Sequence, residues 1–225
     1  VSTDWYEVDI ADAISQIAQQ DVVDRCFAGI TEQCANIERS PDGVISRVFR
    51  RFFNQDQAVV EGMDFEVAYR TEVNFFDNQQ ENLSVRMLAG RMLNREDISA
   101  RGIRSNLMDQ YTMPRLTGNI TSTYSIGPWS LQLQARHISG EKMNRNWTEG
   151  VEVDDNYVAS STWWNSTITY RSELNNGGNW SLAFNVLNLF DTAPPIVASG
   201  TGDQNVLNQY DVYGRRYNLT LNVNF

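Results

Sequence analysis

The chain has 225 residues, a formal net charge of −10 and 41 % hydrophobic residues, which is enough to bury the core of one domain. The acidic balance argues against a nucleic-acid partner, because such partners require a basic surface. The sequence holds no uncharged apolar run of about 18 residues, so we expect no membrane-spanning helix. The chain starts at Val1 without a methionine or a leader, and we expect a removed signal or a longer parent protein.

The N-terminal region predicts a loop with a short helix. Apolar residues recur at helical spacing in Ala11–Asp24. Cys26 and Cys34 follow, with neither C-x-x-C spacing nor a nearby histidine, so zinc is disfavoured. A local disulfide is expected, and two free thiols are the alternative. We interpret residues 11–60 as mostly an outer loop, with Val44–Phe53 as the extension of a strand.

Alternation of apolar and polar residues dominates the rest of the chain. In Gly62–Arg70 one strand face is apolar and the other is charged. The pattern returns in four later segments: Leu116–Ile126, Trp129–Ile138, Trp180–Leu187 and Arg216–Phe225. The polar faces are predicted to line a lumen through Asp64, Glu66, Arg70, Arg86, Gln132, Gln134, Arg136, Asn185 and Asn218.

The lengths of the strands and their connections favour a membrane barrel over a soluble sandwich. The strands approach the ~9–11 residues of a tilted membrane strand. Short turns at Gly127-Pro128 and Asn175–Gly178 alternate with long polar connections, as in outer-membrane barrels. The predicted fold is all-β: about eight antiparallel strands of a larger transmembrane barrel, with long outer loops and short periplasmic turns. A complete small porin or adhesin and a secreted carbohydrate-binding β-sandwich are the alternatives.

Three motifs carry a resemblance to a known family. Asn188-Leu189-Phe190-Asp191, followed by prolines, resembles the penultimate strand of TonB-dependent outer-membrane receptors. Gly214-Arg215 resembles the start of their last strand, and Gly62–Glu66 resembles an upstream segment. The terminal alternation resembles the signal read by the barrel-assembly machinery, namely Tyr217, Leu219, Leu221, Val223 and Phe225.

The resemblance implies a transport function in the bacterial outer membrane. Family members close roughly 22 strands around a plug. They import scarce nutrients such as siderophores, vitamin B12 or carbohydrates, driven by the TonB system. We therefore expect residues 1–225 to be the C-terminal portion of such a barrel, in contact with outer-membrane lipid. The plug domain and its TonB box are expected outside this chain.

Candidate ligand-binding residues lie in the long connections. Arg145, Trp147 and Trp163 combine a cation with aromatic rings, a set that could hold a small molecule or an oligosaccharide, such as a sugar or a chelated metal. Anchoring of the aromatic side chains in an interfacial girdle at the membrane rim is the favoured alternative. Glu149, Glu152, Asp154 and Asp155 form an acidic stretch without EF-hand spacing, which favours a solvated loop over a calcium site. No nucleophile elbow, phosphate loop or H-E-x-x-H motif occurs. We expect no enzyme activity, no cofactor and no metal.

Overall fold

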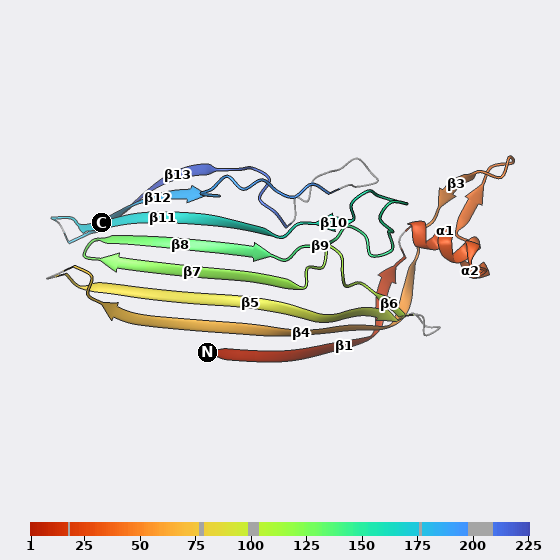
Figure 1. The fold of residues 1–225 in the computed structure, drawn as a ribbon, viewed down its shortest axis with the longest axis horizontal. Helices are drawn as coiled ribbons and strands as arrows, with labels where there is room; N and C mark the ends of the chain where they lie inside the picture. Colours follow the sequence, from red (N-terminus) through yellow and green to blue (C-terminus); the bar gives the residue numbers. More distant parts are fainter. Residues whose placement is uncertain (18, 77–78, 99–103, 176, 198–208) are drawn as a thin grey trace. The chain divides into compact units, whose positions relative to one another are not determined.

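The computed structural model describes residues 1–17, 19–76, 79–98, 104–175, 177–197 and 209–225 (Figure 1). The chain divides into two compact units. Unit 1 comprises Val1–Tyr6, Glu61–Asn94 and Leu107–Phe225, and unit 2 comprises Glu7–Val60 and Arg95–Asn106. The two units are described separately below.

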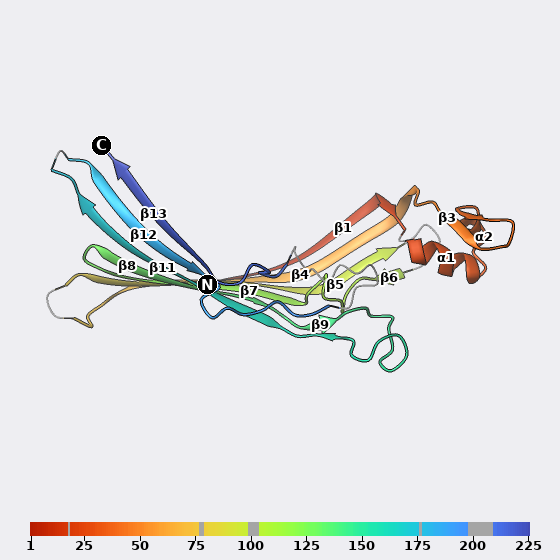
Figure 2. The ribbon, with the colours of Figure 1, turned by 90° about the horizontal axis from the view of Figure 1, so that it is seen from above.

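One large antiparallel sheet dominates the fold. Its strands are β1 (Ser2–Gln16), β4 (Phe52–Val73), β5 (Glu81–Ile98), β7 (Leu116–Ile126), β8 (Trp129–Ile138), β11 (Ser161–Glu173), β12 (Asn179–Leu187) and β13 (Arg216–Asn224). They neighbour one another in this order, so β1 and β13 are the two edges. The prediction of an all-β fold with about eight antiparallel strands is confirmed. Seen from above, the strands from β7 to β13 rotate relative to one another, as expected for a twisted sheet (Figure 2).

Short turns lie at one end of these strands and long connections at the other (Figure 1). Gly127 turns from β7 to β8 with a φ of +51°, a conformation that glycine adopts without strain. Glu81 secures the turn before β5, because its carboxylate accepts hydrogen bonds from the Phe75 and Phe76 amides and from the Tyr124 hydroxyl. The long connections contain the short strands β9 (Glu141–Lys142) and β10 (Tyr157–Val158).

The sequence located several strands correctly. The limits expected for β7 and β8 are those of the structure, and β13 ends one residue before Phe225. Gly62–Arg70 lies within β4, which is much longer than the segment recognised from alternation. Alternation identifies the part of a strand that has two different faces, and it misses extensions whose two faces are alike.

Unit 2 contains the helices, the disulfide and three short strands. Helix α1 spans Gln19–Phe27, α2 spans Thr31–Cys34, and β2 (Ile37–Arg39) pairs with β3 (Ile45–Val48). The strand β6 (Arg104–Asn106) pairs with the end of β5. The predicted disulfide between Cys26 and Cys34 is confirmed. Within the described residues, no helix has the length and apolar character required to cross a membrane.

Two expectations for this region were wrong in their limits. Residues Ala11–Gln16 belong to β1, so the helix begins at Gln19 and not at Ala11. β1 neighbours β4 in the sheet, and this tertiary pairing overrides the local helical spacing. The segment Val44–Phe53 is not one strand extension, since it holds β3, a break, and the first residues of β4.

Candidate functional site

The sheet of unit 1 has a polar face built by strand register. Thr121 pairs with Gln134, Gln134 pairs with Asn165, and Asn165 donates a hydrogen bond to Gln134 across 3.0 Å. A second row of paired residues crosses four neighbouring strands, namely Gln132, Thr167, Asn185 and Asn218. The Thr167 hydroxyl donates a hydrogen bond to the Asn185 side-chain oxygen across 2.8 Å. The sequence predicted one face for Gln132, Gln134, Asn185 and Asn218, and the register places these four on one face. Asn165 and Thr167 of β11 join them there, although alternation did not identify that strand.

An ion pair lies on the same face between β4 and β5. The Arg86 guanidinium contacts the Glu66 carboxylate at 2.8 Å. Gly90 lies close by, and a Cβ at this position would approach Asp64 Oδ1 to 3.1 Å. The absence of a side chain at Gly90 thus leaves room for the acidic group of the neighbouring strand.

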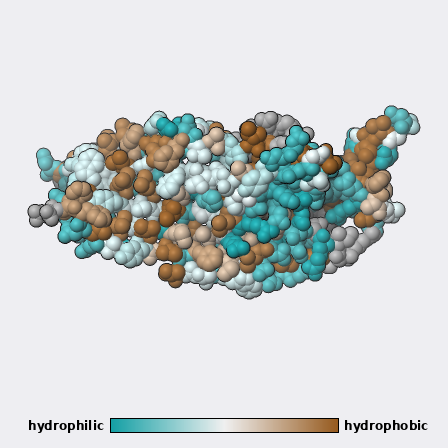
Figure 3. All heavy atoms as spheres, viewed as in Figure 1, coloured by the Kyte–Doolittle hydropathy of each residue, from teal (hydrophilic) through white to brown (hydrophobic). Residues whose placement is uncertain are grey.

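The opposite face is apolar and exposed. Ile168 pairs with Leu131 and Phe184, and each of these side chains is more than a third exposed. Tyr217, Leu219, Leu221 and Val223 continue this face at the edge strand, where the Phe184 and Tyr217 rings stack at 6.2 Å. Apolar residues gather over the strands near the short turns, while hydrophilic residues gather over the long connections (Figure 3). A soluble domain rarely leaves such a large apolar face open to water.

Aromatic pairs lie near both ends of the apolar face. Tyr170 contacts Trp129 at 4.8 Å and Trp180 at 5.5 Å beside the short turns. Trp164 and Phe190 lie 6.4 Å apart toward the long connections. Trp164 and Tyr170 are six residues apart on β11, which corresponds to about 20 Å at ~3.4 Å per residue. This separation is close to the ~25 Å apolar band of outer-membrane barrels.

The motif Asn188–Asp191 forms a polar clip at the end of β12. The Asn188 side chain is completely buried. Its Oδ1 accepts a hydrogen bond from the Thr192 amide at 2.8 Å, and its Nδ2 donates one to the Thr192 carbonyl at 3.0 Å. Asp191 Oδ1 accepts the Arg215 amide at 2.8 Å. A Cβ at Gly214 would lie 3.0 Å from the same oxygen, and the φ of Gly214 is +69°. The motif residues therefore join the two ends of one long connection.

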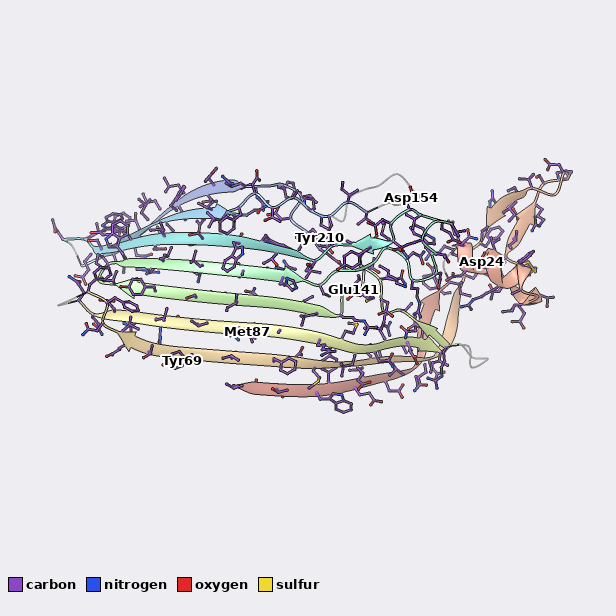
Figure 4. All side chains as sticks on the ribbon, viewed as in Figure 1. Asp24, Tyr69, Met87, Glu141, Asp154 and Tyr210 are labelled. Carbon is purple, nitrogen blue, oxygen red and sulfur yellow. A yellow bond between two sulfur atoms is a disulfide. The ribbon has the colours of Figure 1, made fainter. Side chains whose placement is uncertain are left out.

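A small hydrophobic cluster forms where the long connections meet the polar face. Ile138 and Trp163 come from β8 and β11, whereas Val158, Val197 and Tyr210 come from the connections. The cluster fixes these parts of the connections against the end of the sheet. Tyr210 lies there beside Glu141 (Figure 4).

Two hollows open on the polar face, with Arg136 on the wall of both. The larger hollow has a volume of about 530 Å³ and is lined mainly by the β4, β5, β7 and β8 strands, including Asp64, Glu66 and Asn119. The smaller hollow, of about 280 Å³, is lined by Arg136, Trp163, Gln209, Tyr210, Tyr213 and Arg216, among others. The Arg136 guanidinium stacks on the Trp163 ring at 5.3 Å, so its direction is fixed.

The electrostatics of the smaller hollow depend on Tyr210. This side chain is only 5 % exposed, and burial, followed by coulombic interaction with Tyr111 and with the Glu141 carboxylate, raises the pKa of its hydroxyl. The hydroxyl therefore keeps its proton and can donate a hydrogen bond. Arg216, which also lines the hollow, pairs with Asp211 at 2.8 Å and stacks on Tyr213 at 5.0 Å.

The three predicted ligand-binding residues lie on different elements. Trp163 is buried within β11 on the polar face and is not part of an interfacial girdle. Arg145 and Trp147 lie in the connection between β9 and β10, whose fold is held by the buried Asn156. The sequence did not single out Tyr210, Tyr213 and Arg216 as lining a site. They lie close in sequence to Gly214-Arg215, which resembles the start of the family's last strand.

The acidic connection between β9 and β10 uses its carboxylates locally. Each of three carboxylates accepts a hydrogen bond from a backbone amide of the same connection: Glu149 from Asn156, Glu152 from Thr148, and Asp155 from Tyr157. Among the described residues, no three acidic, histidine or cysteine side chains gather in a way that could hold a metal ion. These hydrogen bonds account for three of the four acidic residues as caps of their own loop.

Comparison with known proteins agrees with this architecture. Residues 1–189 match the family model described as TonB dependent receptor-like, beta-barrel, which covers β1 through β12 and the start of the clip. No curated protein and no solved structure matches the chain.

Proposed function

Since this chain belongs to the TonB-dependent receptor β-barrel family, we propose that it forms part of an outer-membrane active transporter for a scarce nutrient. The family consists of transporters and not of enzymes, and its members reside in the bacterial outer membrane. In this proposal the apolar face contacts lipid, the polar face lines the lumen, and the long connections lie outside the cell.

The contrast between the two faces of the sheet carries the proposal. From β7 to β13 the register keeps mainly apolar side chains on one face and mainly amide, hydroxyl or charged side chains on the other. A barrel wall between lipid and a polar lumen needs this arrangement along every strand. The aromatic pairs at both ends supply the groups that sit at the two membrane surfaces.

Energy for import comes, in this proposal, from a TonB complex that pulls on a plug held inside the closed barrel. The chain contributes wall and outer connections, and no step of covalent chemistry. Tyr217–Phe225 serves as the strand recognised by the barrel-assembly machinery, because an edge strand offers unpaired backbone groups. The ligand is a small molecule or an oligosaccharide that enters from the side of the long connections.

A nutrient-depletion experiment tests this function. Native cells, cells lacking the receptor and cells lacking TonB are grown in the same limiting medium, and the compounds remaining are measured by mass spectrometry. We expect at least one compound that only the native cells remove. Unchanged depletion after receptor loss, or depletion that continues without TonB, would contradict the proposal. A matched strain lacking an unrelated outer-membrane porin controls for general permeability.

A further inference from the structure

The smaller hollow differs in charge from the chain as a whole. Its wall carries two arginines, Arg136 and Arg216, and one aspartate, Asp211, so its formal charge is +1. The whole chain carries −10. We call this space the Arg136 hollow; its wall also contains Trp163, Gln209, Tyr210 and Tyr213.

Among the described residues, Arg136 is held by an aromatic ring and not by a carboxylate. Its guanidinium stacks on Trp163, and no carboxylate in the described part of the chain forms an ion pair with it. By contrast, Arg86 on the same polar face pairs with Glu66, and Arg216 in the same hollow pairs with Asp211. A guanidinium that is oriented but unpaired presents its fork of donors to whatever enters the hollow.

Two residues that line the hollow, Gln209 and Tyr210, each carry a buried polar atom that has no hydrogen-bond partner in the described part of the chain. Neither the Tyr210 hydroxyl nor Gln209 Oε1 has a hydrogen-bond partner among the described residues. Gln209 is held by its amide nitrogen, which donates to the Thr112 carbonyl at 3.0 Å. Buried polar groups are normally satisfied, so an exception at a hollow points to a bound molecule that supplies the partners.

We propose that the Arg136 hollow binds an anionic oxygen group, a carboxylate or a phosphate, carried by a hydroxylated ligand such as an acidic sugar. Arg136 receives the anionic oxygens, the Tyr210 hydroxyl donates to a neighbouring oxygen, and Gln209 Oε1 accepts from a ligand hydroxyl. The largely exposed ring of Tyr213 offers a surface for the apolar side of a sugar ring.

The size of the hollow limits what it accepts. Its volume of about 280 Å³ is at the lower end of the ~300–1,000 Å³ found for small-molecule sites. It therefore takes one ring-sized group at the end of the ligand and not the whole nutrient. This inference rests on the proposed function, because it requires the polar face to lie on the path of the ligand.

Titration of the full-length receptor, purified from outer membranes in detergent, tests the inference. The probes are trigalacturonate, which carries carboxylates, glucose 6-phosphate, which carries a phosphate, and the neutral trisaccharide maltotriose. We expect at least one anionic probe to bind measurably and more tightly than maltotriose. Binding of the carboxylate probe alone or the phosphate probe alone identifies the anionic group. If neither anionic probe binds, or if maltotriose binds equally well, the inference is overturned.

Matched variants locate the binding. Arg136→Gln should lower the affinity for the anionic probe that binds by roughly 10- to 100-fold, as expected for loss of a charge-assisted pair. Arg86→Gln makes the same charge change on the same face, outside the hollow, and should leave affinity within about twofold. Equal losses in both variants would contradict the proposal. Arg136→Lys, which keeps the charge but loses the fork, should give an intermediate loss and serves if the glutamine variant fails to fold.

The outcome is separable from that of the proposed function. Heat-dependent gel migration of each variant reports whether the barrel forms, and nutrient depletion reports transport. A receptor that forms a barrel and imports a nutrient through TonB, but does not bind either anionic probe, refutes the Arg136 hollow and leaves the transport function standing.

Discussion

Replacing Asn188 should open the long connection between β12 and β13. In Asn188→Ala the side chain loses both hydrogen bonds to Thr192, whose amide and carbonyl lie beside a completely buried residue. Two lost bonds with partly unsatisfied partners cost about 2–4 kcal/mol. The backbone at Asn188 has a φ of +52°, which asparagine tolerates and alanine does not, and this adds ~1–2 kcal/mol. The expected total is therefore about 3–6 kcal/mol.

Two matched variants separate the two causes. Asn188→Gly removes the hydrogen bonds but accepts a positive φ, so it should cost ~1 kcal/mol less than Asn188→Ala. Asn188→Asp keeps the acceptor, but it buries a carboxylate whose second oxygen faces the Thr192 carbonyl oxygen, so it should cost at least as much as the alanine variant.

Hydrogen exchange of the receptor in detergent measures the effect locally. The Thr192 amide donates to Asn188 Oδ1, and the Arg215 amide donates to Asp191 Oδ1. In Asn188→Ala both amides should lose protection, while amides in the centre of β8 keep it, because local opening precedes global unfolding. Unchanged exchange at Thr192 in the alanine variant would refute the clip. A loss of protection across the whole sheet would refute its local character.

Three further predictions concern Gly214 in the clip, Tyr210 in the smaller hollow and the disulfide of unit 2. Gly214→Ala should destabilise the clip by ~1–2 kcal/mol, because the φ of Gly214 is +69° and the added Cβ would crowd Asp191. Normal protection of the Arg215 amide in this variant would count against the account. Burial raises the pKa of Tyr210, so the stability contributed by its neutral hydroxyl should be complete below about pH 10 and lost as pH rises through the folded pKa. Ultraviolet difference titration against Tyr210→Phe measures this, and a Tyr210 that ionises at or below the value of free tyrosine would contradict it. The Cys26–Cys34 disulfide closes a loop across a sequence separation of 8, so its reduction should lower the stability of unit 2 by about 2–3 kcal/mol. Faster hydrogen exchange at the Val22 amide measures this loss. A variant with both Cys26→Ser and Cys34→Ser is the control and should not respond to reductant.

The sequence predicted the sheet well because its information is local and repeated. β7 and β8 follow from alternation on either side of Gly127-Pro128, where a turn is required. The disulfide followed from two cysteines close together in a polar stretch. The start of α1 was misplaced because the pairing of β1 beside β4 involves residues roughly fifty positions apart, which no local pattern reports.

The candidate site was predictable only in part. Arg136 was assigned to the polar face from its alternation in β8, and Trp163 was named as a candidate because of its ring. Their stacking and their meeting with Tyr210 depend on strand register and on a connection that returns to the sheet. The motif Asn188–Asp191 was recognised by resemblance, whereas its physical role as a clip came from hydrogen bonds to Thr192 and Arg215.

The central claim is that one face of this sheet contacts lipid and the other lines a polar lumen. Ile168 and Thr167 are neighbours on β11 in the middle of the sheet, and the register fixes them on opposite faces. A nitroxide label is placed at each position in the receptor reconstituted in lipid vesicles, and its collisions with oxygen and with a water-soluble nickel complex are compared. The account predicts a lipid-exposed label at Ile168 and a label shielded from lipid at Thr167. The reverse pattern, or water exposure of both labels, would contradict it.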